Sequence, residues 1–203
     1  MSQNKGCLII FEGIDHVGKS TIVALVNKEL RKSYSDIEVY QFPGKYDGTI
    51  GKLVYDIHHN LAKYNINSID PLSLQLLHIS AHIDILNSKI IPAIQNGKIV
   101  LLDRYWWSTI AYGEGDGIPP NMLYKIVEVE REITDNIFNK VFIYITRNNR
   151  IKDFPQDKED VILRTYNELF NKEKSESKYI IENNQEIAST TKKILKIIKE
   201  KLR

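Results

Sequence analysis

Residues 13–20 read Gly-Ile-Asp-His-Val-Gly-Lys-Ser, a glycine-rich loop that ends in a lysine and a hydroxyl side chain. Glycines let successive backbone N–H groups curl around phosphate oxygens, and a following helix presents its N-terminus to the same anion. Lys19 is placed to reach the β- and γ-phosphates of a nucleoside triphosphate, and the Ser20 hydroxyl to bind Mg²⁺. The loop therefore predicts binding of ATP together with Mg²⁺.

A second group of residues that could do chemistry follows a buried apolar run, in the segment IVLLDRYWWSTIAY over residues 99–112. At the end of a strand, Asp103 could hold Mg²⁺ directly or through water, and Arg104 could grip a phosphate with two hydrogen bonds. A surface ion pair is the alternative interpretation. The sequence has neither the Asn/Thr-Lys-x-Asp motif of switch GTPases nor the strand-terminal Asp-Glu of motor ATPases, which favours a kinase of small molecules.

Short apolar runs alternate with longer helical patterns along the chain. This alternation predicts an α/β fold, with a five-stranded parallel sheet flanked by helices on both faces and ligands at the carboxyl ends of the strands. The expected strands are Cys7–Phe11, Glu38–Phe42, Ile99–Leu102, Val141–Ile145 and Tyr179–Ile181. Helices are expected over 19–32 and over 70–96. A last helix is expected at the end of the chain, where apolar residues from Ile187 to Leu202 share one face.

The long helix over 70–96 has recognisable ends. Asp70 is a capping residue, Pro71 suits the first turn and Gly97 suits the terminus, while Pro92 predicts a kink. Apolar residues lie nearly all round this helix, and one sheet face cannot cover them all. The pattern therefore predicts a partner subunit.

Length, charge and cysteine content exclude several classes of protein. The 203 residues favour one domain, 1–203, and a net charge of +2 from mixed basic and acidic residues argues against nucleic-acid or membrane binding. No apolar run reaches membrane-spanning length, and the first residues lack the pattern of a signal peptide. Cys7 has no partner for an internal disulfide, so we expect a cytoplasmic protein.

The motifs and their order resemble the thymidylate kinase family. The loop reads FEG-x-D-x-x-GKST from Phe11, a Phe-Pro follows the second strand at Phe42, and a long helix carries I-x-P-A-I-x-x-G into the third strand. D-R-Y-x-x-S-x-x-A-Y then starts at Asp103. The resemblance covers most of Ile9–Tyr112 and implies a P-loop kinase fold, a homodimer, and ATP-dependent phosphorylation of a deoxynucleoside monophosphate, dTMP to dTDP.

The resemblance also implies roles for individual residues. Asp15 would face the acceptor sugar near its 3′-hydroxyl instead of the triphosphate, and Asp15, Lys19 and Arg104 would form the catalytic set. Lys45 stands where the family has an arginine, and with Arg104 it would hold the acceptor phosphate. The acceptor-binding residues expected in full are Asp15, Phe42, Lys45, His78, His82, Arg104, Tyr105, Ser108 and Tyr112.

Donor contacts are expected along the loop and at a lid after the fourth strand. The loop residues are Gly13, Asp15, His16, Val17, Gly18, Lys19, Ser20 and Thr21. The family's lid is rich in arginine; here it is short, about residues 147–160, and supplies Arg147 and Arg150, for which a solvated charged turn is the alternative. His16 stands where the family has arginine or glycine, and either contacts phosphate or points to solvent.

Two further segments each allow two interpretations. Trp106-Trp107 invites a base-stacking role, but packing is the role we expect. Asn183-Asn184-Gln185 lies where the family's adenine contacts lie, although side-chain amides also suit an ordinary turn.

The acceptor pocket departs from the family pattern. His78 and His82 occupy the positions of a phenylalanine that stacks on thymine and an arginine that hydrogen-bonds the base. Residues four apart share a helix face, so both histidines are expected to line one pocket; structural hydrogen bonds or a metal site are the alternatives. The expected acceptor is dTMP. Another or modified pyrimidine nucleotide is one alternative, and a nucleotide-binding regulator with little transferase activity is another.

Overall fold

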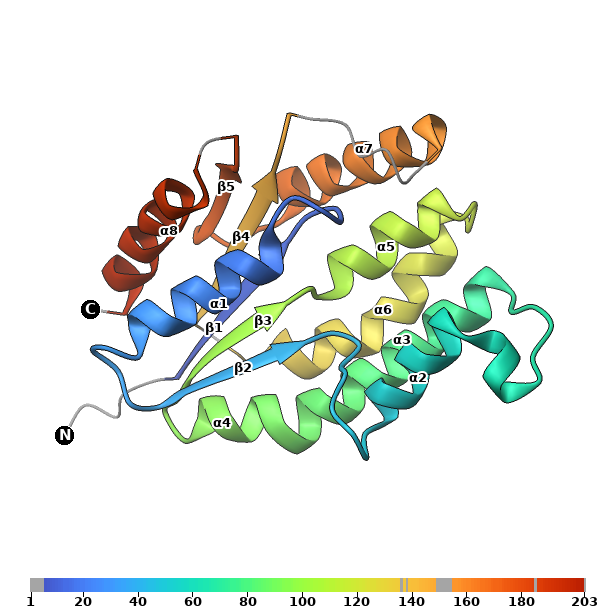
Figure 1. Ribbon diagram of the computed structural model, residues 1–203, viewed down its shortest axis with the longest axis horizontal. Helices are drawn as coiled ribbons and strands as arrows, with labels where there is room; N and C mark the ends of the chain where they lie inside the picture. Colours follow the sequence, from blue (N-terminus) through green and yellow to red (C-terminus); the bar gives the residue numbers. More distant parts are fainter. Residues whose placement is uncertain (1–5, 136, 138, 149–154, 185, 203) are drawn as a thin grey trace.

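The computed structural model describes residues 6–135, 137, 139–148, 155–184 and 186–202. At its centre lies a five-stranded parallel sheet in the order β2-β3-β1-β4-β5 (Figure 1). The strands are β1 (Cys7–Glu12), β2 (Ile37–Gln41), β3 (Ile99–Asp103), β4 (Lys140–Thr146) and β5 (Lys178–Glu182). The predicted α/β fold and all five strands are confirmed, with strand ends shifted by one residue at most.

The burial of the strands follows their sequence pattern. The central strands β1 and β3 are buried at every position, and β4 at all but its ends, as their continuous apolar runs require. The edge strands β2 and β5 are only partly buried; β2 has Glu38 among its apolar residues, and β5 has a charged residue at each end. The core therefore lies on both faces of the three central strands.

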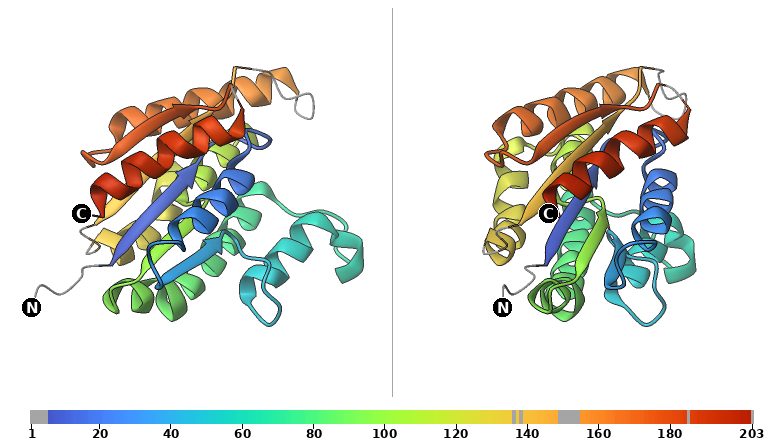
Figure 2. Two further views of the ribbon diagram at one scale, coloured as in Figure 1. Left: turned by 60° about the vertical axis from the view of Figure 1, so that its left-hand side comes forward. Right: turned by 90° about the vertical axis from the view of Figure 1, so that its left-hand side faces the viewer.

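Helices cover both faces of the sheet (Figure 2). Helix α1 packs with α8 on one face, and α5 packs with α6 and α7 on the other. Beside this second layer, α2 packs on α3. The bounds are α1 (Lys19–Leu30), α2 (Ile50–His59), the short 3₁₀ helix η1 (Leu61–Tyr64), α5 (Trp106–Gly115), α6 (Pro120–Asp135), α7 (Gln156–Lys172) and α8 (Ile187–Lys201). In the described part of the chain, no helix is long and apolar enough to span a bilayer.

The helix predicted over 70–96 is divided into α3 (Pro71–Ile85), a π-helical turn η2 (Leu86–Ile90) and α4 (Ile91–Gln95). Asp70 caps it as expected, because its carboxylate accepts a hydrogen bond from the Ser73 N–H at 3.0 Å. Gly97, with φ 78°, ends it. Pro92 has no N–H to donate and its ring crowds the carbonyl one turn earlier. The hydrogen-bond ladder opens into the π turn just before it, so the predicted helix is present over 71–95 and is irregular next to the proline at which a kink was expected.

Strand register brings the sequence motifs to one edge of the sheet. Phe11 on β1 pairs with Asp103 on β3, and Gln41 on β2 pairs with the same residue from the other side. The glycine loop, the Phe42 turn and Arg104 therefore leave neighbouring strands at adjacent points. This is the carboxyl edge of a parallel sheet, where ligands are expected.

Candidate active site

The loop between β1 and α1 has a shape that its glycines permit. Gly13 has φ 141°, and a Cβ there would lie 2.3 Å from the carbonyl oxygen of Ile145. Gly18 has φ 90°, and a Cβ there would lie 2.7 Å from the Nδ2 atom of Asn183. Both fixed glycines of the motif are thus required by conformation and by close approach. His16, between them, has φ 61° and an exposed side chain.

Lys19 and Ser20 lie at the first turn of α1. The Lys19 side chain is buried, and its Nζ donates to the carbonyl oxygen of Ile14 at 3.0 Å. Burial, together with the nearby Arg104 guanidinium, lowers the pKa of Lys19 to about 7. A bound triphosphate would reverse this effect, because it places negative charge beside the ammonium group.

Ser20, in the first turn of α1, contacts Asp103, the last residue of β3. The Ser20 hydroxyl donates to Oδ2 of Asp103 at 2.6 Å. The other carboxylate oxygen, Oδ1, is buried and has no hydrogen-bond partner among the described residues. A hydroxyl beside a carboxylate with one unsatisfied oxygen is a donor set that fits Mg²⁺, which prefers oxygen ligands.

Arg104 joins the loop to the residues expected around the acceptor. Its backbone is left-handed, with φ 73°, and its guanidinium donates to the Ser108 hydroxyl at 3.0 Å and pairs with the Asp15 carboxylate. Tyr112 completes the group, since its hydroxyl donates to Oδ2 of Asp15 at 2.7 Å. Burial alone would raise the pKa of Asp15, but Arg104 and Tyr112 hold it below its ordinary value. Asp15 is therefore an ionised acceptor of hydrogen bonds at neutral pH.

Beneath Arg104 lies Glu12, a carboxylate that sequence analysis missed. It accepts hydrogen bonds from the Tyr105 backbone N–H at 2.9 Å and from the Ser108 hydroxyl at 2.7 Å. Burial raises the pKa of Glu12 to about 7, although the Ser108 hydrogen bond and Arg104 favour its charged form. Glu12 thus fixes the backbone that follows the left-handed Arg104. Its position at the end of the first strand was the one sequence signal for this role.

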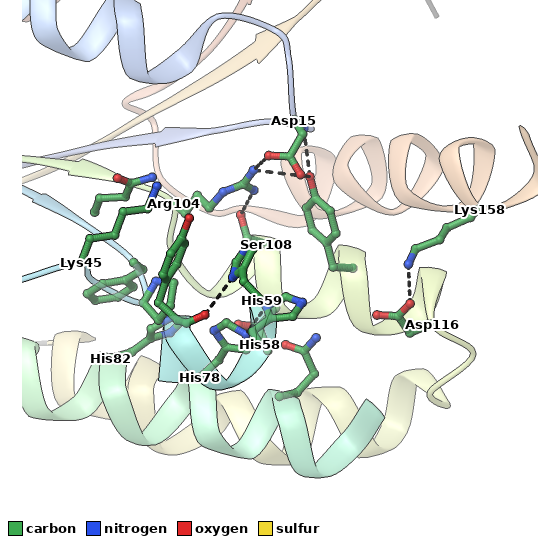
Figure 3. A pocket seen from close by; sticks show the side chains of 17 residues that line it. Asp15, Lys45, His58, His59, His78, His82, Arg104, Ser108, Asp116 and Lys158 are labelled. Atoms are coloured by element: carbon green, nitrogen blue, oxygen red, sulfur yellow. Dashed lines mark hydrogen bonds and ion pairs between the residues drawn. The ribbon is translucent and has the colours of Figure 1, made fainter. Parts of the chain in front are cut away.

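A cavity of about 410 Å³ opens beside Arg104 and Asp15 (Figure 3). Its walls come from the loop after β1, the turn after β2, helices α2, α3 and α5, and the start of α7. Of the residues predicted to bind the acceptor, eight line this cavity: Asp15, Phe42, Lys45, His78, His82, Arg104, Ser108 and Tyr112. The sequence motifs therefore converge on one nucleotide-sized space.

Tyr105 is the exception. Its side chain is fully buried, its hydroxyl is bonded to Thr134, and its ring centroid lies 6.3 Å from that of Phe42. It does not line the cavity but packs near Phe42, so, unlike the other residues expected around the acceptor, it is separated from this space. Trp107 is also fully buried and stacks on Phe142, which confirms the packing role expected for it.

The two histidines expected in the base pocket have different surroundings. His82 is 3% exposed, stacks on Phe42 with ring centroids 4.0 Å apart, and places Nδ1 3.1 Å from the buried Glu130 carboxylate. His78 is only partly buried, and its Nε2 lies 3.2 Å from Nδ1 of His58 on α2. His82 is therefore held within the packing, while His78 faces a polar neighbour. Among the described residues, no three or more His, Cys, Asp or Glu side chains form a group suited to a metal ion.

Several cavity residues have no role assigned in the sequence analysis. One is Tyr55, whose ring centroid lies 4.6 Å from the ammonium of Lys45, a residue that lines the cavity as expected. His59 stacks on the same tyrosine. At the far side Lys158 pairs with Asp116. The His58-His59 doublet was visible in the sequence, but only the packing of α2 on α3 shows that it faces the cavity.

The donor side is described in part. Arg147 is exposed just after β4, while Arg150 and residues 149–154 of the predicted lid lie outside the described residues, as does Gln185. Asn183 is buried, donates from Nδ2 to the Val17 carbonyl at 2.8 Å, and accepts from the Thr190 hydroxyl at 2.9 Å. Its amide thus holds the phosphate loop in place.

The sheet order, the loop after β1 and the Ser20–Asp103 pair define the class of P-loop kinases. The solved thymidylate kinase of Ehrlichia chaffeensis has this fold, with a TM-score of 0.75 and 21% identity over 95% of this chain and 98% of that one. The solved thymidylate kinase of Candida albicans also has this fold, with a TM-score of 0.76 and 19% identity over 98% of this chain and 94% of that one. The thymidylate kinase family model matches residues 11–194, and the chain belongs to that family.

Relatives of known sequence agree with this assignment. The thymidylate kinase of Thermoanaerobacter sp. strain X514 is 40% identical over 143 residues, which are 70% of this chain and 66% of that protein. The match thus spans just under two thirds of that relative's length. The probable thymidylate kinase of Caldivirga maquilingensis is 26% identical over 202 residues, 96% of this chain and 95% of that protein. The resemblance noted up to Tyr112 therefore extends into the second half of the chain.

Proposed function

We propose that the protein transfers the γ-phosphoryl group of ATP to dTMP, forming ADP and dTDP. The observation that carries this proposal is the position of Arg104. Its guanidinium pairs with Asp15 of the phosphate loop and also lines the cavity, so it lies where a donor phosphate and an acceptor phosphate would meet. Membership of the thymidylate kinase family supports the choice of substrates.

The residues contribute position and charge, because phosphoryl transfer needs little covalent help from the protein. An oxygen of the dTMP 5′-phosphate forms a bond to the γ-phosphorus while the bond from that phosphorus to the β–γ bridging oxygen breaks, and ADP leaves. The attacking phosphate is already largely ionised at neutral pH, since its second pKa is about 6. Lys19 and Arg104 would stabilise the charge on the transferring group.

The sugar and the phosphate of the acceptor would be oriented by two charged side chains. Asp15, held ionised by Arg104 and Tyr112, would accept a hydrogen bond from the sugar hydroxyl. Lys45, which is exposed at the cavity wall, would approach the acceptor phosphate as a point charge. Asp15 is then a specificity carboxylate, which accounts for an acidic residue inside a phosphate loop.

Ser20 and Asp103 would hold Mg²⁺, as their oxygen donors and the unsatisfied Oδ1 of Asp103 suggest. When bound, this ion would neutralise charge on the β- and γ-phosphate oxygens. Asp103 also keeps Ser20 oriented before any ligand binds, which pre-organises the site.

A second candidate acceptor is another pyrimidine nucleotide. The observation that favours it is the chemistry of the base end, where His78 and His82 stand at the positions of an aromatic ring and a guanidinium, and His78 pairs with His58. An imidazole pair has both hydrogen-bond donors and acceptors, unlike a guanidinium.

The test is an acceptor screen with Mg·ATP, in which ADP release and nucleoside diphosphate formation are both measured for dTMP, dUMP, dCMP, dAMP and dGMP. We expect ADP and dTDP to form in equal amounts with dTMP. Turnover of another pyrimidine with none of dTMP would favour the second candidate. ATP binding without transfer to any acceptor would contradict both and indicate a nucleotide-binding regulator.

We also propose that the protein is a cytoplasmic homodimer. Neighbouring helices of the same chain cover much of α3, but Leu53 on α2 and Leu76 on α3 remain 48% exposed, with Tyr46 and Ile50 nearby in sequence also exposed. A partner subunit would cover such a surface. Sedimentation at micromolar concentration should show a dimer, and a monomer throughout would contradict the proposal. A cytoplasmic location suits an enzyme that uses ATP and whose Cys7 is a buried free thiol.

A further inference from the structure

Two histidines from different helices meet at the side of the cavity opposite Asp15 (Figure 3). Nε2 of His78 on α3 lies 3.2 Å from Nδ1 of His58 on α2, and the rings meet edge to face with centroids 5.2 Å apart. Both side chains line the cavity. Since Arg104 and Asp15 mark the phosphate and sugar end, this pair lies at the end where the base of an acceptor would be.

Both imidazoles of this pair are neutral at pH 7. Burial lowers the pKa of His78 to about 3 and also lowers the pKa of His58. A neutral imidazole has one N–H and one bare nitrogen. The contact between the rings therefore uses the N–H of one ring and the bare nitrogen of the other.

This arrangement leaves two equivalent ways to place the protons. If His78 donates from Nε2, its Nδ1 is an acceptor, and the Nε2–H of His58 is a donor. If His58 donates from Nδ1 instead, its Nε2 becomes the acceptor and the Nδ1–H of His78 the donor. Each state leaves one donor and one acceptor on the pair, and the two states exchange their positions.

The hydrogen-bonding edges of the two kinds of pyrimidine base differ in the same way, with donor and acceptor positions exchanged. A 4-keto pyrimidine offers the acceptor O4 next to the donor N3–H, whereas a 4-amino pyrimidine offers a donor amino group next to the acceptor N3. A guanidinium has donors alone and can satisfy the exocyclic group of the first kind but not of the second.

We propose that the His58–His78 pair reads this edge, and that the acceptors are pyrimidine deoxynucleotides of both kinds, 4-keto and 4-amino. The proposal rests on the function proposed above and names its substrate class. Gln75, one turn before His78 on α3, is buried and lines the same cavity. The side-chain amide of Gln75 carries an N–H donor and a carbonyl acceptor, and their positions exchange when the amide rotates by half a turn. Gln75 can therefore also match either kind of base edge. His82 is excluded from this role because Phe42 and Glu130 hold it.

The test compares dUMP with dCMP, which differ at the edge in question and not by a methyl group, with dTMP as a third acceptor. For the wild-type protein, kcat/KM for dUMP and dCMP should agree within about tenfold. His78→Lys places a fixed donor at the pair and should lower kcat/KM for dCMP relative to dUMP by roughly ten- to a hundredfold, the effect of an unsatisfied polar group. His78→Gln, whose amide can turn to present either a donor or an acceptor, should lower kcat/KM for both acceptors but leave their ratio within about tenfold.

The outcomes separate this inference from the proposed function. If the wild-type protein uses dTMP but favours dUMP over dCMP by more than tenfold, the inference falls and the proposed function stands. An unchanged dUMP-to-dCMP ratio in His78→Lys, with thermal unfolding like that of the wild type, would also overturn it. No turnover of any of the three acceptors would overturn both. If His78→Lys does not fold, the ratio of kcat/KM for dUMP to that for dCMP, measured in the wild-type protein and in His78→Gln, still tests the inference.

Discussion

The two ends of the cavity are built in different ways. At the phosphate end, the groups come from the loop 13–20 and from Asp103-Arg104, where short motifs follow the ends of neighbouring strands. At the base end, His58 and His78 come from two helices that meet only through packing. Phosphates are alike in all nucleotides, whereas base edges differ. Under the proposed function, the first end would carry out the reaction and the second end would select the acceptor.

The largest effect should come from the phosphate end, with Lys19→Ala. Removing a charge that stabilises the transition state should lower kcat by about 10²–10³-fold or more. Steady-state kinetics with dTMP would measure this loss. The control is Lys28→Ala, an exposed lysine on the same helix, which should leave kcat unchanged. Near-normal turnover by a folded Lys19→Ala protein would refute the role given to the loop.

Asp15→Asn tests the boundary between the two ends. Its charged hydrogen bonds to Arg104 and Tyr112 would weaken, so kcat/KM for dTMP should fall by roughly ten- to a hundredfold while ATP affinity changes little. Kinetics for dTMP and calorimetric titration of ATP measure the two effects. A loss of ATP affinity with normal acceptor affinity would place Asp15 on the donor side instead.

His82→Ala and His78→Ala should differ in their effects on stability and on acceptor preference. His82→Ala removes a buried ring stacked on Phe42 and leaves Glu130 without its partner, which should cost about 2–4 kcal/mol of unfolding free energy. His78→Ala should cost about 1 kcal/mol or less but change the ranking of acceptors. Denaturant unfolding and an acceptor screen measure these. Equal losses of stability would mean that both histidines are structural.

A smaller effect is expected at the support of the phosphate loop, in Asn183→Ala. The substitution removes the hydrogen bonds with Val17 and Thr190. The Val17 bond, worth about 1 kcal/mol, is the one that reaches the phosphate loop, so the KM for ATP should rise roughly fivefold with the KM for dTMP unchanged. Asn171→Ala, at an exposed position near the end of α7, is the matched control. If Asn183→Ala affects the two substrates equally, its amide does not act through the loop.

The last expected effect concerns pH. The pKa of Lys19 is lowered to about 7 in the free protein, and bound triphosphate should raise it again, so above pH 7 ATP binding should take up a proton. ATP affinity should then fall by up to tenfold per pH unit above 7. Calorimetric titrations at pH 8 in buffers of different ionisation enthalpy would measure an uptake of up to one proton. Zero uptake would mean that Lys19 is already charged before ATP binds.

Local sequence motifs predicted where the residues of the phosphate end lie relative to one another. The loop, Asp103 and Arg104 lie within a few residues of strand ends, and the parallel sheet fixes where strand ends meet, so spacing alone was sufficient. The five strands were predictable for a related reason, since three of them are continuous apolar runs that only burial on both faces explains.

The rest depended on packing that the sequence does not show. His58 becomes part of the site because α2 packs on α3, and Lys158 because the start of α7 reaches the cavity. Glu12 and Tyr105 lie beneath the wall, and a strand-end carboxylate or a tyrosine after Asp-Arg gives no sign of which way it points. The π turn before Pro92 is likewise a local adjustment that helix periodicity hides.

The central claim is that the groups around Arg104 pass a phosphoryl group from ATP to a nucleotide in the adjoining cavity. The most direct measurement follows ATP labelled at the γ-phosphate, mixed with Mg²⁺ and equimolar dTMP. The account predicts that the label moves to the β-position of dTDP, with one ADP formed for each dTDP, and that Lys19→Ala transfers it at least about a hundredfold more slowly. Label recovered as inorganic phosphate, or retained in ATP while the folded protein binds both nucleotides, would contradict it.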